Sequence, residues 1–461
     1  MPELAIRRKY LDTSDINCTV MIALCFLVTS TGWLSWEYHL LDQITAGATD
    51  VCTMVIGYLL QAAGIAVYEM ILHRKPALSG ILLPASLIIH MILMVPAVLS
   101  PVAGLTILSG LMMNLVCGMI AGCYLRDLTG KASANRKASV FGVSYAVAIL
   151  TSWLLSMIGG GKIYYSNYVL LICFVLTIVA IVADRRITVQ NTGAGDESSS
   201  RLDQRNPVKM VFLLEACLLV LLFSIVNSSG FAFPAADLGQ IVNVEFSRLV
   251  YAAGLLIAGF VTDRNRKHGA ICALTALIIP FIIFSLRGEP IPSAIFWVLS
   301  YFTFGFYSVY RVILFSDIAA ERNLMYLSGV GLLAGRIGDA LGEGICLLLA
   351  DHAAIRVGLT AILFAASVAL FFKLYQVLYI PEAVHQQSEK ERFAQFAAVH
   401  DLSLREQDML HLILDKKTNS EIADHLCISE NTVKFHVRNL LQKTGCKNRK
   451  ELLTIFETYR E

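Results

Sequence analysis

Long apolar runs separated by short polar segments dominate the first 380 residues of this chain. A helix that crosses the hydrocarbon core of a bilayer needs about 20 predominantly apolar residues. Twelve runs approach or exceed that length, and they lie near residues 16–36, 51–72, 80–99, 102–125, 139–158, 166–183, 208–229, 243–262, 269–286, 292–315, 324–350 and 354–376. The pattern predicts an all-α, polytopic membrane domain of twelve transmembrane helices over residues 1–380.

Composition agrees with this prediction. The chain has 461 residues and is 56% hydrophobic but only 16% charged, whereas soluble proteins carry about 25% charged residues. An ordinary soluble enzyme and a disordered or fibrous protein are therefore excluded. Nine of the 11 cysteines fall in apolar runs and no Cys-x-x-Cys pair occurs, so we expect buried small side chains, no disulfide, no metal site and no cofactor.

Basic residues between the runs indicate the orientation of the chain. With a cytoplasmic N-terminus, the inner segments carry 18 Lys and Arg residues, and the outer loops carry only Lys162, Arg287 and Arg356. Lys and Arg accumulate on the cytoplasmic side of membrane proteins. An even number of helices also returns the chain to its starting side. We therefore expect a multi-pass protein of the inner (cytoplasmic) membrane with both termini in the cytoplasm.

The twelve runs divide into two halves of six, over residues 1–183 and 208–380. The polar segment between them, 184–207, contains Gly-Ala-Gly-Asp-Glu-Ser-Ser-Ser-Arg and has neither a helical nor a strand period. Such a composition predicts a flexible linker, which the orientation above places in the cytoplasm.

The loop after the eighth run has the sequence Gly259-Phe-Val-Thr-Asp263-Arg264-Asn-Arg266-Lys267. Together with the two halves, this loop resembles the major facilitator superfamily, whose cytoplasmic signature is Gly-x-x-x-Asp-Arg-x-Gly-Arg-Lys. The second Gly of the signature is missing here. The matching loop of the first half is His-Arg-Lys-Pro at 73–76, and it lacks the whole signature. The alternative explanation of Asp263 and Arg264 is a cluster of charges at the inner face that anchors helix ends.

Three charged residues of the eleventh run are candidates for a ligand or gating site. A charge at the centre of a bilayer costs at least ~2.5–3.5 kcal/mol on insertion scales and persists where it is paired or hydrated. Arg336, Asp339 and Glu343 are spaced i, i+3 and i+7, so they share one helix face. That face is either an internal ion-pair network or the wall of a cavity. For Arg311 and Asp317, near a predicted inner helix end, snorkelling is the cheaper explanation.

The composition changes after about residue 380, and we expect a linker over 381–400 and a separate domain over 401–461. Four short amphipathic helices are predicted there. Ser403 with Glu406 three residues later is typical of a capping box at the start of the first helix. Ser429 is expected to cap the third helix and Gly445 to end it. Two short helices with a tight turn, the second basic on one face, indicate a helix-turn-helix.

The residues of this domain also carry a specific motif. It consists of Leu-Ser-Leu-Arg-Glu at 402–406, Thr-Asn-Ser-Glu-Ile-Ala at 418–423, Ile-Ser-x-x-Thr-Val-Lys-x-His-Val-x-Asn-Leu at 428–440 and Arg-x-Glu-Leu at 449–452. The motif resembles the LuxR-type (NarL/FixJ-like) DNA-binding domain of bacterial regulators. Two residues depart from it: Lys416 stands where the family usually has Gly, and Thr444 replaces the usual Leu.

The resemblance implies binding of double-stranded DNA by the third helix, which fits a major groove. Between residues 430 and 450, six Lys and Arg residues oppose one Glu, and such local positive charge attracts a phosphate backbone. The residues expected to contact DNA are Thr432, Val433 (against a thymine methyl group), Lys434, His436, Arg438, Asn439 and Lys443. By the same resemblance, we expect a homodimer that pairs through the fourth helix.

Two functions remain open at this point. In the first, a transporter-like domain binds an unknown small molecule, and its state controls DNA binding by the tethered domain of a one-component transcription regulator. In the second, the chain is an active transporter with a regulatory tail. The direct fusion and the degenerate loop motif favour the first. The sequence contains no P-loop, Gly-x-Ser-x-Gly, His-Glu-x-x-His, kinase or phosphoacceptor motif, so we do not expect an enzyme.

Overall fold

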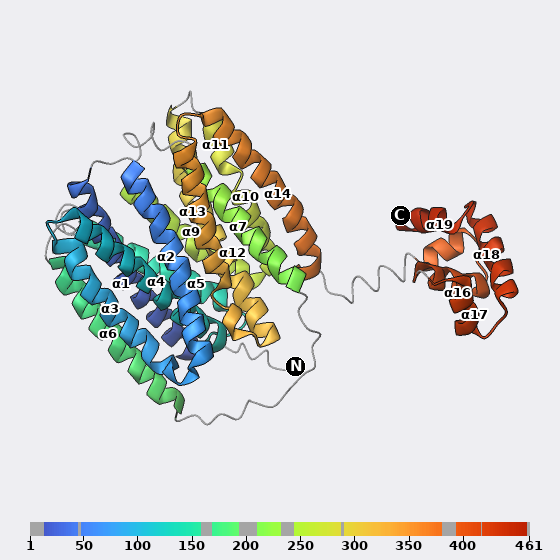
Figure 1. Cartoon of the computed structure of the whole chain (residues 1–461), viewed down its shortest axis with the longest axis horizontal. Coiled ribbons are helices and arrows are strands. Elements are labelled where there is room, and N and C mark those ends of the chain that lie inside the picture. The colour runs from blue at the N-terminus through green and yellow to red at the C-terminus, as the bar shows by residue number, and fades with distance from the viewer. Residues whose placement is uncertain are drawn as a thin grey trace, which may run out of the picture. The chain divides into compact units, whose positions relative to one another are not determined.

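The structure, a computed structural model, describes residues 13–44, 48–157, 168–192, 210–231, 244–286, 290–379, 393–415 and 417–458. Throughout these ranges the regular elements are helices (Figure 1), which confirms the predicted all-α class. The chain divides into two compact units, Met1–Leu374 and Tyr375–Glu461. Each unit is described separately below.

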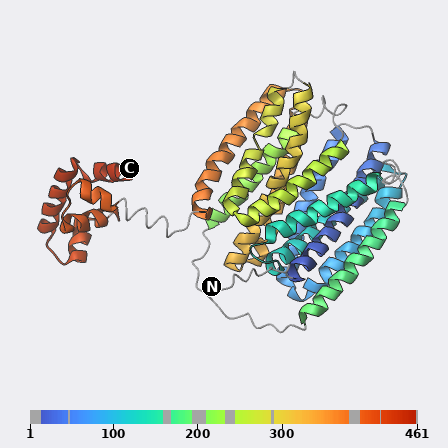
Figure 2. The ribbon, with the colours of Figure 1, turned by 180° about the vertical axis from the view of Figure 1, so that it is seen from behind.

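Long helices that run side by side build the first unit (Figures 1 and 2). The first half contains α1 (Thr13–Gln43), α2 (Ala48–Arg74), α3 (Ser79–Leu99), α4 (Ala103–Lys131), α5 (Lys137–Met157) and α6 (Tyr168–Thr192). The second half contains α7 (Met210–Phe231), α9 (Val244–Arg264), α10 (Arg266–Ala276), α11 (Ile279–Ser285), α12 (Pro290–Arg322), α13 (Val330–Leu348) and α14 (Ala353–Tyr379). One-turn 3₁₀ helices precede α3 and α13, at Pro76–Leu78 and Met325–Leu327.

Within the described ranges, eleven helical segments are long and apolar enough to cross a membrane, and α10 and α11 together form one of them. The predicted run at 324–350 corresponds to α13, which has 19 residues and is not among the eleven. It carries three charged side chains, those of Arg336, Asp339 and Glu343. The class of a polytopic helical domain therefore agrees with the prediction, whereas the count of twelve spans stays a prediction.

Large apolar side chains cover the outer surface of this bundle. On α3 and α6, for example, the exposed side chains include Ile81, Ile88, Ile92, Leu171, Phe174 and Ile178. Contiguous apolar surface of this kind suits contact with lipid rather than with water.

The two halves meet where α5 packs against α9 and α2 packs against α13. Glycines allow the α5 and α9 backbones to approach closely. A Cβ atom added to Gly142 would lie 2.5 Å from the carbonyl oxygen of Leu255, and one added to Gly259 would lie 2.7 Å from that of Ala138. Small residues permit such packing between helices in apolar surroundings.

A charge network joins the α9–α10 turn to the first half. The carboxylate of Asp263 accepts hydrogen bonds from the backbone N–H groups of Ala138 (3.0 Å) and Ser139 (2.6 Å), in the first turn of α5. Free N–H groups and the helix dipole make this end of a helix attractive to a carboxylate. Arg266 then donates to Asp263 at 2.7 Å and to Asp317 at 2.8 Å. The loop motif therefore anchors helix ends. Asp317 forms an ion pair with Arg266, so snorkelling alone does not explain its position.

The structure shortens both predicted linkers. Helix α6 continues to Thr192, so the first part of the segment 184–207 is helical, and residues 193–209 lie outside the described ranges. In the segment 381–400, residues 393–399 form a helix. Phe396 and Ala397 of this helix are buried in the core of the second unit, with Phe393 packed against them. Their i, i+3, i+4 spacing gives this short segment an apolar face.

The second unit contains the four predicted helices, α16 (Leu404–Leu414), α17 (Asn419–Leu426), α18 (Glu430–Thr444) and α19 (Arg449–Thr458). They surround a separate apolar core, whose fully buried members include Phe396, Met409, Leu410, Ile422, Val433, Leu440 and Leu452. Each of the four helices contributes at least one of these side chains, so the core fixes α18 against the other helices of the unit.

The contact between α2 and α4 provides a test of the packing. A Cβ atom at Gly64 would lie only 2.0 Å from the carbonyl oxygen of Leu115. Overpacking of this kind typically destabilises a protein by about 1–3 kcal/mol. We expect Gly64→Ala to lower the Tm of the detergent-purified chain. In the control Gly104→Ala, the new methyl group on α4 meets nothing within 4 Å, and an equal loss of Tm there would contradict the packing.

Candidate nucleic-acid interface and membrane cavity

Capping boxes fix the start of α16 and the start of α17. The Ser403 hydroxyl accepts from the backbone N–H of Glu406 at 3.4 Å, and the Glu406 carboxylate accepts from that of Ser403 at 2.8 Å. This confirms the predicted box. Thr418 and Glu421 form a second box at the start of α17. This second box was not predicted, although its Thr-x-x-Glu spacing is the same signal.

The turn between α17 and α18 sets the position of the exposed helix. Cys427 adopts the left-handed conformation, with φ of 53°, and the backbone N–H of Ile428 donates to the carbonyl of Ala423 at 3.0 Å. Ser429 then caps α18, and Gly445 ends it with φ of 71°. The tight turn between the two helices, the Ser429 cap and the Gly445 end are as predicted. The departure at Lys416 lies outside the described residues.

Helix α18 has one buried and one exposed face. Val433, Val437 and Leu440 point into the domain core. The opposite face exposes the predicted DNA contacts Thr432, Lys434 and Arg438, with His436 and Asn439 half-buried. The predicted contact between Val433 and a thymine methyl group is not supported, because that side chain is fully buried.

Phe435 is a surface residue of α18 that the sequence analysis missed. Its side chain is 60% exposed, and its ring centroid lies 5.5 Å from that of His436. Helical spacing was the available signal, because Phe435 follows Thr432 by three residues and precedes Arg438 by three, which places all of them on the outward face.

Two of the predicted basic residues serve the fold of the domain. Lys443 donates to the Glu406 carboxylate at 2.8 Å and to the carbonyl of Asp401 at 2.6 Å, which ties α18 to the start of α16. Arg449 donates to the carbonyl of Lys417 at 2.7 Å. Lys443 is exposed but held by these contacts, so the other exposed cations of this stretch are Lys434, Arg438, Lys447 and Lys450.

The compact four-helix unit, its tight turn and its basic exposed helix together define a helix-turn-helix DNA-binding domain. The family model described as bacterial regulatory proteins, luxR family (GerE), matches residues 400–456. The chain belongs to this family, and its C-terminal unit is a DNA-binding regulator domain.

Curated relatives agree with this assignment. The chain is 44% identical over 50 residues to the spore germination protein GerE of Bacillus subtilis, a match that covers 11% of this chain and 68% of GerE. It is 44% identical over 55 residues to the nitrate/nitrite response regulator protein NarP of Escherichia coli, covering 12% of this chain and 26% of NarP. It is 48% identical over 61 residues to the transcriptional regulatory protein YhcZ of B. subtilis, covering 13% of this chain and 26% of YhcZ. The chain thus spans about a quarter of the length of the latter two.

The first unit contains a cavity of about 290 Å³ between its two halves. Helices α1, α2, α4 and α5 of the first half and α12 and α13 of the second half supply the lining. The charged side chains in the lining are those of Arg311 and Arg336. A polar pair in an otherwise largely apolar cavity is the usual composition of a small-molecule site.

The three charged residues predicted on α13 have different places in the structure. Arg336 lines the cavity, and its guanidinium lies 3.3 Å from the buried carboxylate of Asp339. Arg311 lies 3.1 Å from the same carboxylate and is only 5% exposed. Glu343, one turn further along α13, is not a lining residue. Snorkelling is therefore wrong for Arg311: α12 extends to Arg322, so this residue lies well inside the helix.

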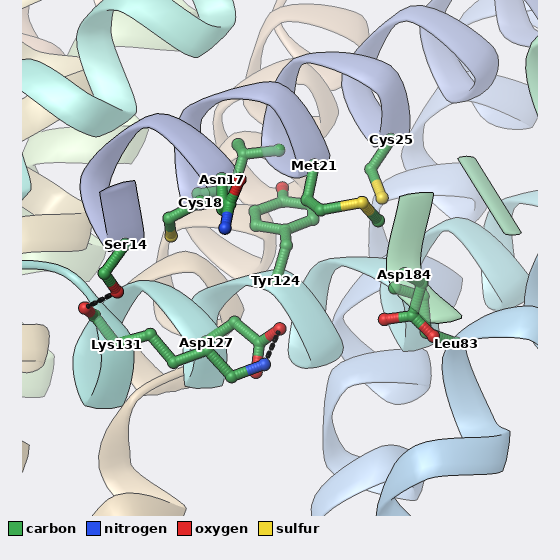
Figure 3. Close-up of a pocket in the computed structure, with 11 residues that line it drawn as sticks. Ser14, Asn17, Cys18, Met21, Cys25, Leu83, Tyr124, Asp127, Lys131 and Asp184 are labelled. Carbon is green, nitrogen blue, oxygen red and sulfur yellow. Dashed lines mark hydrogen bonds and ion pairs between the residues drawn. The ribbon is translucent and has the colours of Figure 1, made fainter. Parts of the chain in front are cut away.

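A second pocket, near the start of α1, is less suited to a ligand (Figure 3). The Ser14 hydroxyl donates to the carbonyl of Lys131 at 2.7 Å, and Lys131 pairs with Asp127 at 2.8 Å. The pocket volume is about 20 Å³, which holds about one water molecule. The described residues also contain no group of three or more His, Cys, Asp or Glu side chains that could hold a metal ion.

The two lysines of α18 should respond differently to substitution. Because the exposed Lys434 is predicted to contact a phosphate, Lys434→Ala should weaken binding to all DNA sequences and reduce the slope of log affinity against log salt by about 1. Lys443→Ala should instead lower the Tm of the domain, because Glu406 loses its partner. Fluorescence anisotropy over a salt series measures the slope. An unchanged slope in Lys434→Ala would contradict the predicted phosphate contact.

The Glu406–Lys443 pair predicts a pH dependence of stability. Burial opposes ionisation of Glu406, but hydrogen bonds from Lys443 and Ser403 outweigh it and hold the pKa of Glu406 below its usual value of 4.5. The stabilisation is therefore present above about pH 4.5 and is lost as the pH falls through the lower, folded-state pKa.

We expect Glu406→Gln to destabilise the domain at pH 7 by about 1 kcal/mol, as for a partly exposed charged hydrogen bond. Thermal unfolding followed by circular dichroism should show the two proteins converging in Tm at pH 3. A difference that persists unchanged at pH 3 would show that the Glu406 charge is not its source.

Proposed function

We propose that this chain is a membrane-bound one-component transcription regulator. Its first unit senses a small molecule, and the state of that unit controls DNA binding by the C-terminal unit. The observation that supports this proposal is the presence on one chain of a LuxR-family DNA-binding domain and a helical, membrane-capable unit with a cavity between its halves. Sensing of this kind requires two conformational states of the first unit and a ligand that binds one of them better.

The proposed DNA contacts lie on the outward face of α18. Lys434 and Arg438 neutralise phosphates, which provides affinity without sequence selection. Thr432, His436 and Asn439 reach base edges in the major groove. Phe435 takes the apolar role first given to Val433, because its exposed ring can contact a thymine methyl group.

The segment between α14 and the helix 393–399 offers a route for the signal. Helix α14 ends at Tyr379, and the chain re-enters described structure at residue 393, in the helix 393–399. The Phe396 ring of this helix lies 5.2 Å from that of Phe456 on α19. Since α19 is the proposed pairing helix of a homodimer, any pull on this segment acts directly on the element that sets the spacing of two DNA half-sites.

The proposed location is the inner (cytoplasmic) membrane, with both termini in the cytoplasm, where DNA is accessible. The positive charges of the inner segments support this orientation. The DNA-binding domain then remains at the membrane, and the promoter has to come to it.

An active transporter of the major facilitator type with a regulatory tail is the alternative. The anchoring of α5 by Asp263 and the packing of α2 on α13 between halves support a transporter-like architecture. Vectorial uptake into membrane vesicles, with and without a proton gradient, separates the two functions. Robust turnover would contradict a pure sensor.

Promoter occupancy tests the proposed regulator. Chromatin immunoprecipitation of the full chain should recover a small set of promoters. The double variant Lys434→Ala/Arg438→Ala should lose this occupancy at an unchanged membrane level, because both exposed cations on one face of α18 are removed. In the matched control Lys373→Ala, a 63% exposed lysine side chain of α14 is changed, and occupancy should persist. Equal occupancy by the double variant, or a C-terminal reporter fusion active only outside the cytoplasm, would contradict the proposal.

A further inference from the structure

The two arginines of the cavity share a single carboxylate. Nη1 of Arg311 and Nη1 of Arg336 lie 3.1 and 3.3 Å from the same oxygen, Oδ2 of Asp339. The Ser228 hydroxyl donates to the other carboxylate oxygen at 3.4 Å. Among the residues that the structure describes, the two cations share one direct anionic partner, which leaves one positive charge incompletely paired. Burial of such a charge is costly unless another group compensates it.

The guanidinium groups also retain hydrogen-bonding capacity. Each carries five N–H donors. The bonds of Arg311 to Asp339 and to the Tyr307 hydroxyl both use Nη1. The Nε–H groups of Arg311 and Arg336 are buried and have no hydrogen-bond acceptor among the residues that the structure describes. Both side chains line the cavity, so an acceptor that enters it can satisfy them.

The carboxylates of α13 do not occupy this lining. Asp339 and Glu343 are both absent from it, whereas Arg311 and Arg336 belong to it. A molecule in the cavity therefore meets cationic side chains directly, and this favours an anion over a cation.

The rest of the cavity wall is rich in aromatic rings. Phe26 stacks on Tyr145 with ring centroids 4.3 Å apart, and Tyr124 lies 4.9 Å from Phe26. Aromatic faces and edges favour contact with another flat ring. The aromatic side chains of the lining are those of Phe26, Trp33, Tyr58, Tyr124, Tyr145 and Phe304.

We propose that this cavity binds a small aromatic monocarboxylate, with the carboxylate on Arg311 and Arg336 and the ring among the aromatic side chains. A planar guanidinium matches a carboxylate through two parallel hydrogen bonds. The arginines belong to the second half of the unit and most of the aromatic rings to the first. The bound anion therefore joins the halves and stabilises the conformation in which they are close, which is the bias a sensor needs. This inference rests on the sensing role proposed above.

Binding measurements on the full chain in neutral detergent test the ligand class. The probes are benzoate, phenylacetate and 2-naphthoate, each with its neutral amide and with the corresponding amine. Equilibrium dialysis and thermal shift should show that at least one carboxylate binds ten times more tightly than its amide, and that the amines bind more weakly still. Equal binding of an acid and its amide, preference for the amines, or no binding of any carboxylate would overturn the proposal.

Three variants of the cavity residues should change carboxylate affinity, two by lowering it and one by raising it. Arg311→Gln and Arg336→Gln should each weaken carboxylate binding at least tenfold without changing amide binding. Asp339→Asn should strengthen it, because the internal competitor for both arginines loses its charge. The control Arg74→Gln, an exposed arginine at the end of α2, should bind as the unchanged chain does. If Arg311→Gln does not fold, the other two variants test the proposal. Unchanged carboxylate binding by Arg336→Gln would overturn it, and so would weakened carboxylate binding by Asp339→Asn.

The same preparations separate this inference from the regulator proposed above. DNA binding is measured by anisotropy in the absence of any carboxylate, and promoter activity is measured in cells. Promoter control that persists without carboxylate binding overturns only the ligand class. Carboxylate binding without any promoter control supports the cavity assignment and overturns the regulator.

Discussion

Asp339 sits between two arginines in the interior of a largely apolar helical bundle, and the organisation of the first unit follows from how that charge is balanced. Arg311 on α12 and Arg336 on α13 both point to its carboxylate, so two helices of the second half are held in one register. In such surroundings an unpaired charge is far more costly than in water. The same two arginines line the adjoining cavity, so the structure of the bundle and the candidate ligand chemistry depend on the same side chains.

A related rule operates at the ends of α5 and α9 and in the second unit. Asp263 satisfies backbone N–H groups at the start of α5 and pairs with Arg266, which joins the halves at their ends as Asp339 joins helices at the cavity. In the C-terminal domain, Glu406 caps α16 and receives Lys443 from α18. Each of these carboxylates completes a helix terminus and also binds a cation from another element, so local and tertiary structure reinforce each other.

Local signals made the C-terminal domain the most predictable part. Ser403, Ser429 and Gly445 act within one turn of their own helix, so capping positions could be derived without any tertiary contact. Val433 was misassigned although its spacing to Val437 and Leu440, i, i+4 and i+7, is the local signal of a buried helix face. Phe396 was missed because its apolar face lies in a short segment bounded by polar residues.

The sequence by itself determined the all-α class, the apolar helices, the helix-turn-helix and its basic stretch, because hydrophobic period, composition and capping residues are local properties. Only the tertiary structure decided which charges meet. Arg311 and Asp339 are 28 residues apart and belong to different helices, and no periodicity links them. The cavity likewise takes its lining from six helices of both halves. The reason is physical: pairing of buried charges depends on distance in space, and that distance exists only after the helices have packed.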